Sequence, residues 1–231
     1  MRLIDTHSHL FLEEFSEDLP QVIERARSAG VTHIFMPNID STTIDSMLSV
    51  CNTYNDYCFP MIGLHPTSVN ADYEKELEIV ARELRSFNKY IAIGEVGMDL
   101  YWDKTFLKEQ QIVLDKQINW ALEYDLPVVI HCRDAFGYIY NVLEPYKNTS
   151  LKGVFHSFTG TDDEAARILE FSGFLIGING VVTFKKSRLP EVLTKIPLEK
   201  IVLETDSPYL TPVPNRGKRN ESAYVKDTLM K

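Results

Sequence analysis

Cysteine is scarce in this sequence, which has only Cys51, Cys58 and Cys132 among its 231 residues. Three cysteines cannot all pair with one another, and they are too few for the disulfide framework of a small secreted protein. No segment reaches the roughly 18 consecutive apolar residues of a membrane span, and the N-terminus meets the charge of Asp5 early. We therefore expect a cytoplasmic protein with reduced thiols, without a membrane partner and without an obligate protein partner.

Positive charge is also in deficit. The chain has 24 Lys and Arg against 33 Asp and Glu, which gives a formal net charge of −9. Proteins that hold nucleic acid on a broad basic face need many Lys or Arg contacts to phosphate, so this class is excluded. Chemistry on a phosphate at one local site is not excluded. With 44% hydrophobic and 25% charged residues, the composition is that of a folded globular protein.

Short apolar runs rich in Val, Ile and Phe alternate with longer amphipathic segments, a pattern typical of βαβ units. Helical spacing is clear, for example, over 18–29 and 104–124. The eight expected strands begin at Arg2, Val31, Phe59, Tyr90, Pro127, Gly153, Phe174 and Lys200. This α/β order predicts one (β/α)₈ TIM barrel over 1–231, with a doubly wound open sheet as the alternative. After a long loop over 207–220, only a short helical segment over 222–231 follows, so we expect a truncated last helix.

Histidines fall at the C-terminal ends of the predicted strands. Two carboxylates, Glu95 and Asp206, close the fourth and eighth strands in the same way. In a barrel these strand ends meet on one face, so residues that are remote in sequence converge on one pocket. His33 lies inside the second strand and is left out of this set. The histidines at strand ends are His7, His9, His65, His131 and His156.

Imidazole and carboxylate groups together are the ligands of Zn, Mn, Co, Ni or Fe, and with more waters of Mg. His7 and His9 form an HxH pair whose side chains point the same way from a strand. HxH alone is a weak signal, because two partly exposed polar residues at a strand end would also explain it. The further His, Glu and Asp positions on the same rim make a metal site the better interpretation.

Three of these residues also have structural interpretations. Glu95 could be a solvated strand-end carboxylate, but its apolar and glycine neighbours indicate that the charge needs a partner. Asp206 precedes Pro208 and could be a helix cap or an Asx-turn residue. His65 could cap the turn into the next helix.

Seven motifs of the chain resemble the signature blocks of TatD-type metal-dependent deoxyribonucleases. They occur in order from the first strand to the last loop, so the resemblance covers the whole chain. Ser157 stands where many relatives have Cys, Ser222 stands where relatives often have Pro, and relatives usually continue for a further helix or two. The motifs are DTHSHL from Asp5, GLHP from Gly63, GEVGMD from Gly94, HCRDA from His131, FHSFTG from Phe155, ETDSPYLTP from Glu204 and NRGKRNE from Asn215.

The resemblance implies a TIM-barrel hydrolase of the amidohydrolase-like group with two divalent metal ions of the Mg, Mn, Zn or Co class. His7, His9 and Asp206 would hold the first ion, and Glu95 would bridge both. The second ion would be held by His131 and His156. His65 would face the phosphate, and Arg216 would lie close to the substrate or support the rim.

These residues predict hydrolysis of ester bonds, because two divalent ions can activate a water and stabilise the attacking and leaving oxygens at a phosphate. Asp206 would act both as a ligand and as the proton acceptor, with Glu95 as the second catalytic residue. Glu204 shares the strand face of Asp206 and either supports a ligand or pairs with a lysine or arginine. The favoured activity is an exonuclease-type deoxyribonuclease that acts on DNA, single-stranded or at ends.

Two other functions stay open at this point. The same metal centre could hydrolyse a small lactone, amide or phosphotriester. A non-catalytic metal-binding protein would be expected to have lost a ligand, and all six are present. Aromatic and basic residues in the loops of the predicted active face favour an oligonucleotide, because a small-molecule hydrolase does not need them. These residues are Tyr101, Trp102, Lys185, Lys186, Arg188, Arg216, Lys218 and Arg219.

Overall fold

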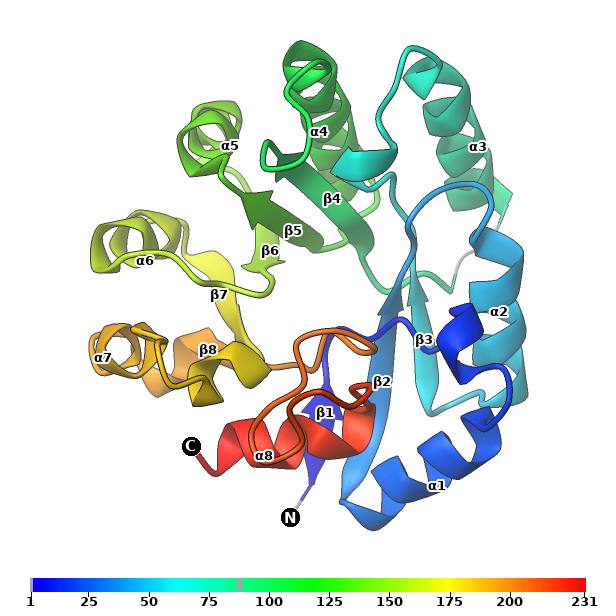
Figure 1. Cartoon of the computed structure of the whole chain (residues 1–231). Helices are drawn as coiled ribbons and strands as arrows, with labels where there is room; N and C mark the ends of the chain where they lie inside the picture. Colours follow the sequence, from blue (N-terminus) through cyan, green and yellow to red (C-terminus); the bar gives the residue numbers. More distant parts are fainter. Residues whose placement is uncertain (1, 87–88) are drawn as a thin grey trace.

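Eight strands and the helices that follow them form a ring in the computed structural model, which describes residues 2–86 and 89–231 (Figure 1). The strands are β1 (Leu3–Asp5), β2 (Val31–Pro37), β3 (Cys58–Met61), β4 (Ile93–Asp99), β5 (Val128–Arg133), β6 (Lys152–Phe155), β7 (Gly173–Ile178) and β8 (Ile201–Leu203). The helices are α1 (Leu19–Ser28), α2 (Ile44–Thr53), α3 (Tyr73–Ser86), α4 (Leu107–Glu123), α5 (Phe136–Leu143), α6 (Asp162–Leu169), α7 (Leu189–Leu193) and α8 (Val225–Leu229).

The strands pair in parallel as two ladders, β1 to β3 and β4 to β8. Two isolated bridges join the ladders, Ile62 to Ile93 on one side and Ser8 to Ser207 on the other. Backbone hydrogen bonds reinforce both joints: the Gly94 N–H donates to the Ile62 carbonyl at 2.8 Å, and the His9 N–H donates to the Ser207 carbonyl at 2.8 Å. The predicted (β/α)₈ barrel is therefore confirmed, and the alternative of an open doubly wound sheet is wrong.

Burial follows the sequence pattern that predicts the elements. β4 is buried at every position, as expected for a parallel strand covered on both faces. The predicted helix over 18–29 is α1, whose Val22, Ile23 and Ala26 face the core at helical spacing. The predicted helix over 104–124 is α4, three residues shorter at its start. In the described part of the chain, each helix is too short or too polar to cross a bilayer.

The chain ends on the short helix expected from the sequence. A 3-10 turn at Ser222–Tyr224 leads into α8, which contacts β1 and β8. Just before the turn, the Glu221 carboxylate accepts hydrogen bonds from the guanidinium of Arg25 on α1, from Nε at 2.8 and 3.0 Å and from Nη2 at 2.7 Å. This fork holds the C-terminal segment against the N-terminal helix.

Gly97 in β4 adopts a φ of +137°, and a Cβ at this position would overlap the backbone carbonyl oxygen of His131 on β5. Gly97→Ala is therefore expected to separate β4 from β5 and to lower the free energy of unfolding by at least about 2 kcal/mol. Gly137→Ala in α5 is the control, because a Cβ added there would meet no atom of the described residues within 4 Å. It should leave stability unchanged or raise it by up to about 1 kcal/mol. Chemical denaturation of both variants tests this difference.

Candidate metal centre

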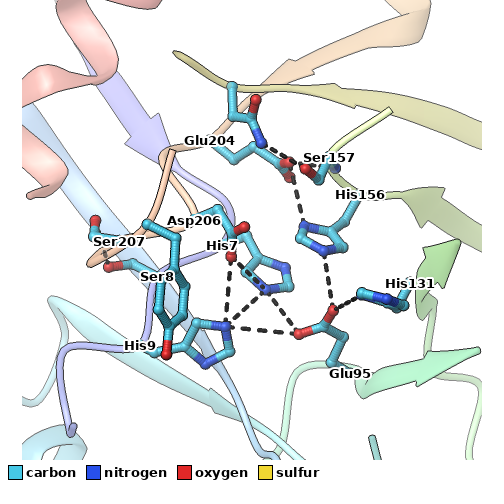
Figure 2. A network of polar contacts seen from close by, with 12 residues as sticks. His7, Ser8, His9, Glu95, His131, His156, Ser157, Glu204, Asp206 and Ser207 are labelled. Atoms are coloured by element: carbon cyan, nitrogen blue, oxygen red, sulfur yellow. Dashed lines mark hydrogen bonds and ion pairs between the residues drawn. The ribbon is translucent and has the colours of Figure 1, made fainter. Parts of the chain in front are cut away.

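The carboxyl ends of the strands bring six predicted ligands together in space. His7 and His9 follow β1, and because a strand has a period of two, both side chains point to the barrel mouth. The other four ligands come from β4, β5 and the segments after β6 and β8, and Figure 2 shows imidazoles converging on the Glu95 carboxylate. Four of the six are buried: His7, His9, Glu95 and His156.

The Glu95 carboxylate lies at the centre of this group. Its Oε2 is 3.1 Å from His7 Nε2 and 3.6 Å from His9 Nε2. Its Oε1 is 2.8 Å from His131 Nδ1 and 2.9 Å from His156 Nε2. Burial alone would raise the pKa of Glu95, but the surrounding imidazoles hold it well below the ordinary value, so the carboxylate is ionised. One carboxylate thus faces two separate pairs of imidazoles.

Asp206 completes the His7 and His9 side of the site. Its Oδ1 lies 3.7 Å from His7 Nε2 and 3.6 Å from His9 Nε2. Its backbone N–H donates to the His7 carbonyl at 2.8 Å, which fixes the start of this loop against β1. The carboxylate therefore faces the imidazoles, and the alternative of an Asx-turn or helix-cap residue is not what the structure shows.

The distances fit a divalent metal ion. Ligand atoms about 2.1 Å from a tetrahedral ion lie roughly 3.4 Å apart. The nitrogens and oxygens of His7, His9, Glu95 and Asp206 lie between 3.1 and 3.7 Å from one another in the pairs named above. The Nε2 atoms of His7 and His9 are 3.2 Å apart, so the two nitrogens either share a hydrogen bond or both direct a lone pair toward one ion. Three overlapping groups have the donors for an ion: His7, His9 and Glu95; His7, His156 and Asp206; and His65, Glu95 and His131.

Two carboxylates behind the imidazoles orient them. Asp99 Oδ2 lies 3.0 Å from His131 Nε2, so we assign a proton to Nε2 that is donated to Asp99. Nδ1, which contacts Glu95 Oε1 at 2.8 Å, is the nitrogen that would bind an ion. Glu204 Oε1 accepts a hydrogen bond from the Ser157 N–H and lies 3.3 Å from His156 Nδ1, so its charge favours a proton on that nitrogen and leaves Nε2 to face Glu95. No lysine or arginine lies within ion-pair distance of Glu204 in the described residues, so its alternative pairing with a cation is not observed.

Asp99 is a site residue that the sequence analysis missed, although it ends the quoted GEVGMD motif. Glu95 and Asp99 are four residues apart on β4, and an even separation puts both side chains on the same side of a strand. This even spacing from Glu95 could have indicated from the sequence that Asp99 faces the site. The structure adds that Asp99 is buried and that its backbone is held from α4 by Gln110.

The two predicted substrate-binding residues differ in position. His65 accepts a hydrogen bond from the Thr67 N–H through Nδ1, which caps the turn at Pro66–Ser68, while its Nε2 lies 3.3 Å from Glu95 Oε1. It therefore caps the turn, as considered from the sequence, and its other ring nitrogen faces Glu95. Arg216 is exposed, stacks its guanidinium 3.8 Å from the centre of the Phe184 ring and donates to the Thr211 carbonyl. This geometry matches support of the rim.

A cavity of about 730 Å³ opens over the cluster. It is large enough to take a small substrate or the end of a polymer. Its polar floor consists of ligand side chains, and its walls come from loops after several strands, as is usual at the C-terminal face of a barrel. The lining includes His9, His65, Glu95, Asp99, Trp102, His131, Arg133, His156, Ser157, Asp206, Tyr209 and Leu210.

Because Glu204 orients His156, Glu204→Gln is expected to weaken metal binding by about 10- to 100-fold while the fold persists. Calorimetric titration of the metal-free protein with Zn²⁺ or Mn²⁺ measures the change. Glu199→Gln is the matched control, since Glu199 is exposed before β8 and lies outside the cavity lining. Equal affinities for the two variants would contradict a role of Glu204 in holding His156.

Comparison with known proteins agrees with this geometry. The family model described as TatD related DNase matches residues 4–231. The uncharacterized metal-dependent hydrolase YabD of Bacillus subtilis is 39% identical over 225 residues, which cover 97% of this chain and 87% of that protein. A protein of Pantoea ananatis named 3'-5' ssDNA/RNA exonuclease TatD is 32% identical, with 98% of this chain and 89% of the relative covered.

A solved structure supports the same relation. The crystal structure of YjjV, a TatD homologue from Escherichia coli K12, superposes with a TM-score of 0.90 at 31% sequence identity. The match covers 99% of this chain and 88% of YjjV. The chain therefore belongs to the TatD family of metal-dependent hydrolases.

Proposed function

We propose that this chain is a deoxyribonuclease that hydrolyses phosphodiester bonds at the ends of single-stranded DNA, with residues 1–231 acting as one catalytic domain. The observation that carries the proposal is the position of Glu95, whose two oxygens face different imidazole pairs. A carboxylate placed in this way is suited to bridge two divalent ions. The name of the Pantoea ananatis relative, an exonuclease on single-stranded DNA and RNA, supports the choice of substrate.

In this proposal His7, His9 and Asp206 would hold one ion, His131 and His156 would hold the other, and Glu95 would contribute to both sites. Bound divalent ions supply an activated water and positive charge against the developing phosphate anion. The protein's own contribution is to fix the donors, since Asp99 and Glu204 orient two of the rings.

Asp206 is suited to accept a proton because it lines the cavity and its carboxylate is ionised. Burial alone would raise its pKa, but the nearby imidazoles of His9, His156 and His7 lower it below the ordinary value. His65 also lines the cavity, where its Nε2 can contact a phosphate oxygen.

The loops around the cavity favour a nucleic acid over a small lactone, amide or phosphotriester. Lys185, Lys186 and Lys218 are exposed or half-buried, which leaves their ammonium groups free to reach a phosphate. Arg219 differs from this group, because it donates to Asp18 Oδ2 at 2.8 Å and stacks on Phe15.

We also propose a cytoplasmic location, which suits the three free thiols.

Asp206→Asn is expected to lower the rate of cleavage of end-labelled single-stranded DNA by about 10²- to 10⁴-fold, because the proton acceptor is lost. Asp163→Asn is the control, since Asp163 lies on α6 and outside the cavity lining. The assay is run with Mg, Mn, Zn and Co, each with and without chelator. Cleavage of a lactone or phosphotriester without cleavage of DNA would contradict the proposal and support the small-molecule alternative.

A further inference from the structure

Three side chains form an exposed cluster beside the cavity. Tyr101 and Trp102 follow β4, and their rings meet edge to face with centroids 4.8 Å apart. The guanidinium carbon of Arg133, at the end of β5, lies 3.9 Å from the Tyr101 ring centre and 5.1 Å from that of Trp102. We name these three residues the aromatic platform.

The platform has the properties of a binding surface. Trp102 is 71% exposed and Tyr101 is 54% exposed, so most of each ring surface stays outside the core. Trp102 and Arg133 line the cavity. No carboxylate lies within ion-pair distance of Arg133 in the residues that the structure describes. Flat aromatic faces beside an unpaired guanidinium are the groups that bind a nucleobase and its phosphate.

Asp99 fixes the platform relative to the metal centre. One of its oxygens, Oδ1, accepts a hydrogen bond from the Tyr101 N–H at 3.0 Å, while Oδ2 faces His131 Nε2 at the same distance. The Leu100 N–H donates to the Arg133 carbonyl at 3.0 Å, which joins the two strands of the platform. A single buried carboxylate therefore positions both a metal ligand and the start of the aromatic turn.

A second aromatic surface lies across the cavity. Tyr209, on the loop after β8, lines the cavity, is 51% exposed and has its ring centre 6.5 Å from that of His9. In the ring of eight strands, β4 and β8 lie on opposite sides of the barrel (Figure 1). The metal centre thus lies between two exposed aromatic surfaces.

From this arrangement we propose that the platform and Tyr209 each stack an unpaired base, so that the phosphate between them lies over Glu95. This inference rests on the proposed nuclease function and adds a physical basis for a preference for single-stranded over duplex DNA. A base in a duplex is already stacked and paired, so it cannot place its face on Trp102 without leaving the helix. Arg133 contacts a phosphate next to the stacked base, and the surface selects single strands.

The first test measures binding and does not depend on turnover. Metal-loaded protein is titrated into fluorescein-labelled, phosphorothioate-linked oligothymidylate, which resists hydrolysis, and Kd is read from anisotropy. Trp102→Ala is expected to raise Kd by about tenfold, the usual loss for one stacked base. Tyr138→Ala is the matched control, because Tyr138 is a 44% exposed aromatic on α5, away from the cavity lining. Equal Kd values for the two variants overturn the inference.

The charge of Arg133 is tested by salt dependence. Arg133→Gln removes one cation, so the slope of log Kd against log salt should fall by about 0.7, the value for one contact to a single-stranded phosphate. An unchanged slope with an unchanged Kd would show that Arg133 only packs on the rings, and this outcome contradicts the phosphate contact.

The second test separates this inference from the proposed function. Bis(p-nitrophenyl) phosphate is a diester too small to span both aromatic surfaces. Trp102→Ala should therefore lower cleavage of single-stranded DNA about tenfold more than it lowers hydrolysis of this small diester, as expected for the loss of one stacked base. The preference for single strands over duplex should fall with it. If Trp102→Ala lowers the rates on both substrates equally, base stacking on the aromatic platform is contradicted, while the proposed phosphodiesterase activity is not. If the unaltered protein hydrolyses neither diester, the proposed nuclease function is wrong. In that case, weaker oligonucleotide binding by Trp102→Ala would still support base stacking on the aromatic platform.

Discussion

The Glu95 carboxylate is buried at the barrel mouth, with five imidazoles between 2.8 and 3.6 Å from its oxygens. An ionised carboxylate in this setting is costly unless positive charge surrounds it, because burial removes its hydration. The imidazoles around it come from segments that follow β1, β3 and β6 and from β5. Only the closed ring of strands brings all of these segments within reach of one side chain, so the site depends on closure of the barrel.

The joints of the barrel coincide with the metal centre. The bridge between Ser8 and Ser207 lies beside His7, His9 and Asp206, and the bridge between Ile62 and Ile93 lies next to Glu95. Beneath the first joint, Asp5 is fully buried and accepts hydrogen bonds from both the N–H and the hydroxyl of Thr205, and burial raises its pKa to about 7. The contacts that close the fold therefore also set the distances between ligands from β1 and β8.

Much of this arrangement could be predicted from the sequence, because each βαβ unit follows local rules. Strand ends could be located from apolar runs, and a parallel barrel places every strand end on one face. The six candidate ligands and His65 could therefore be grouped without coordinates. Arg216 and Arg219 could not be placed in the same way. They lie in a long loop whose path depends on partners elsewhere, Phe184 for the first and Asp18 for the second. Asp99 was missed because its parity with Glu95 indicates only that the two side chains share one face of β4, whereas the ring that it contacts, His131, lies on another strand.

The sequence by itself determined which elements form and which donor types reach the mouth of the barrel, since hydrophobic period and strand parity are local properties. Only the tertiary structure decided how these donors are divided. It assigned one oxygen of Glu95 to the β1 imidazoles and the other to those of β5 and β6, and it placed Asp99 between His131 and the Tyr101 turn. The physical reason is that hydrogen bonds and ion pairs form only when side chains from remote strands are placed to within a few tenths of an ångström. Such distances are set by closure of the ring and by packing around it, and no segment of the chain contains them.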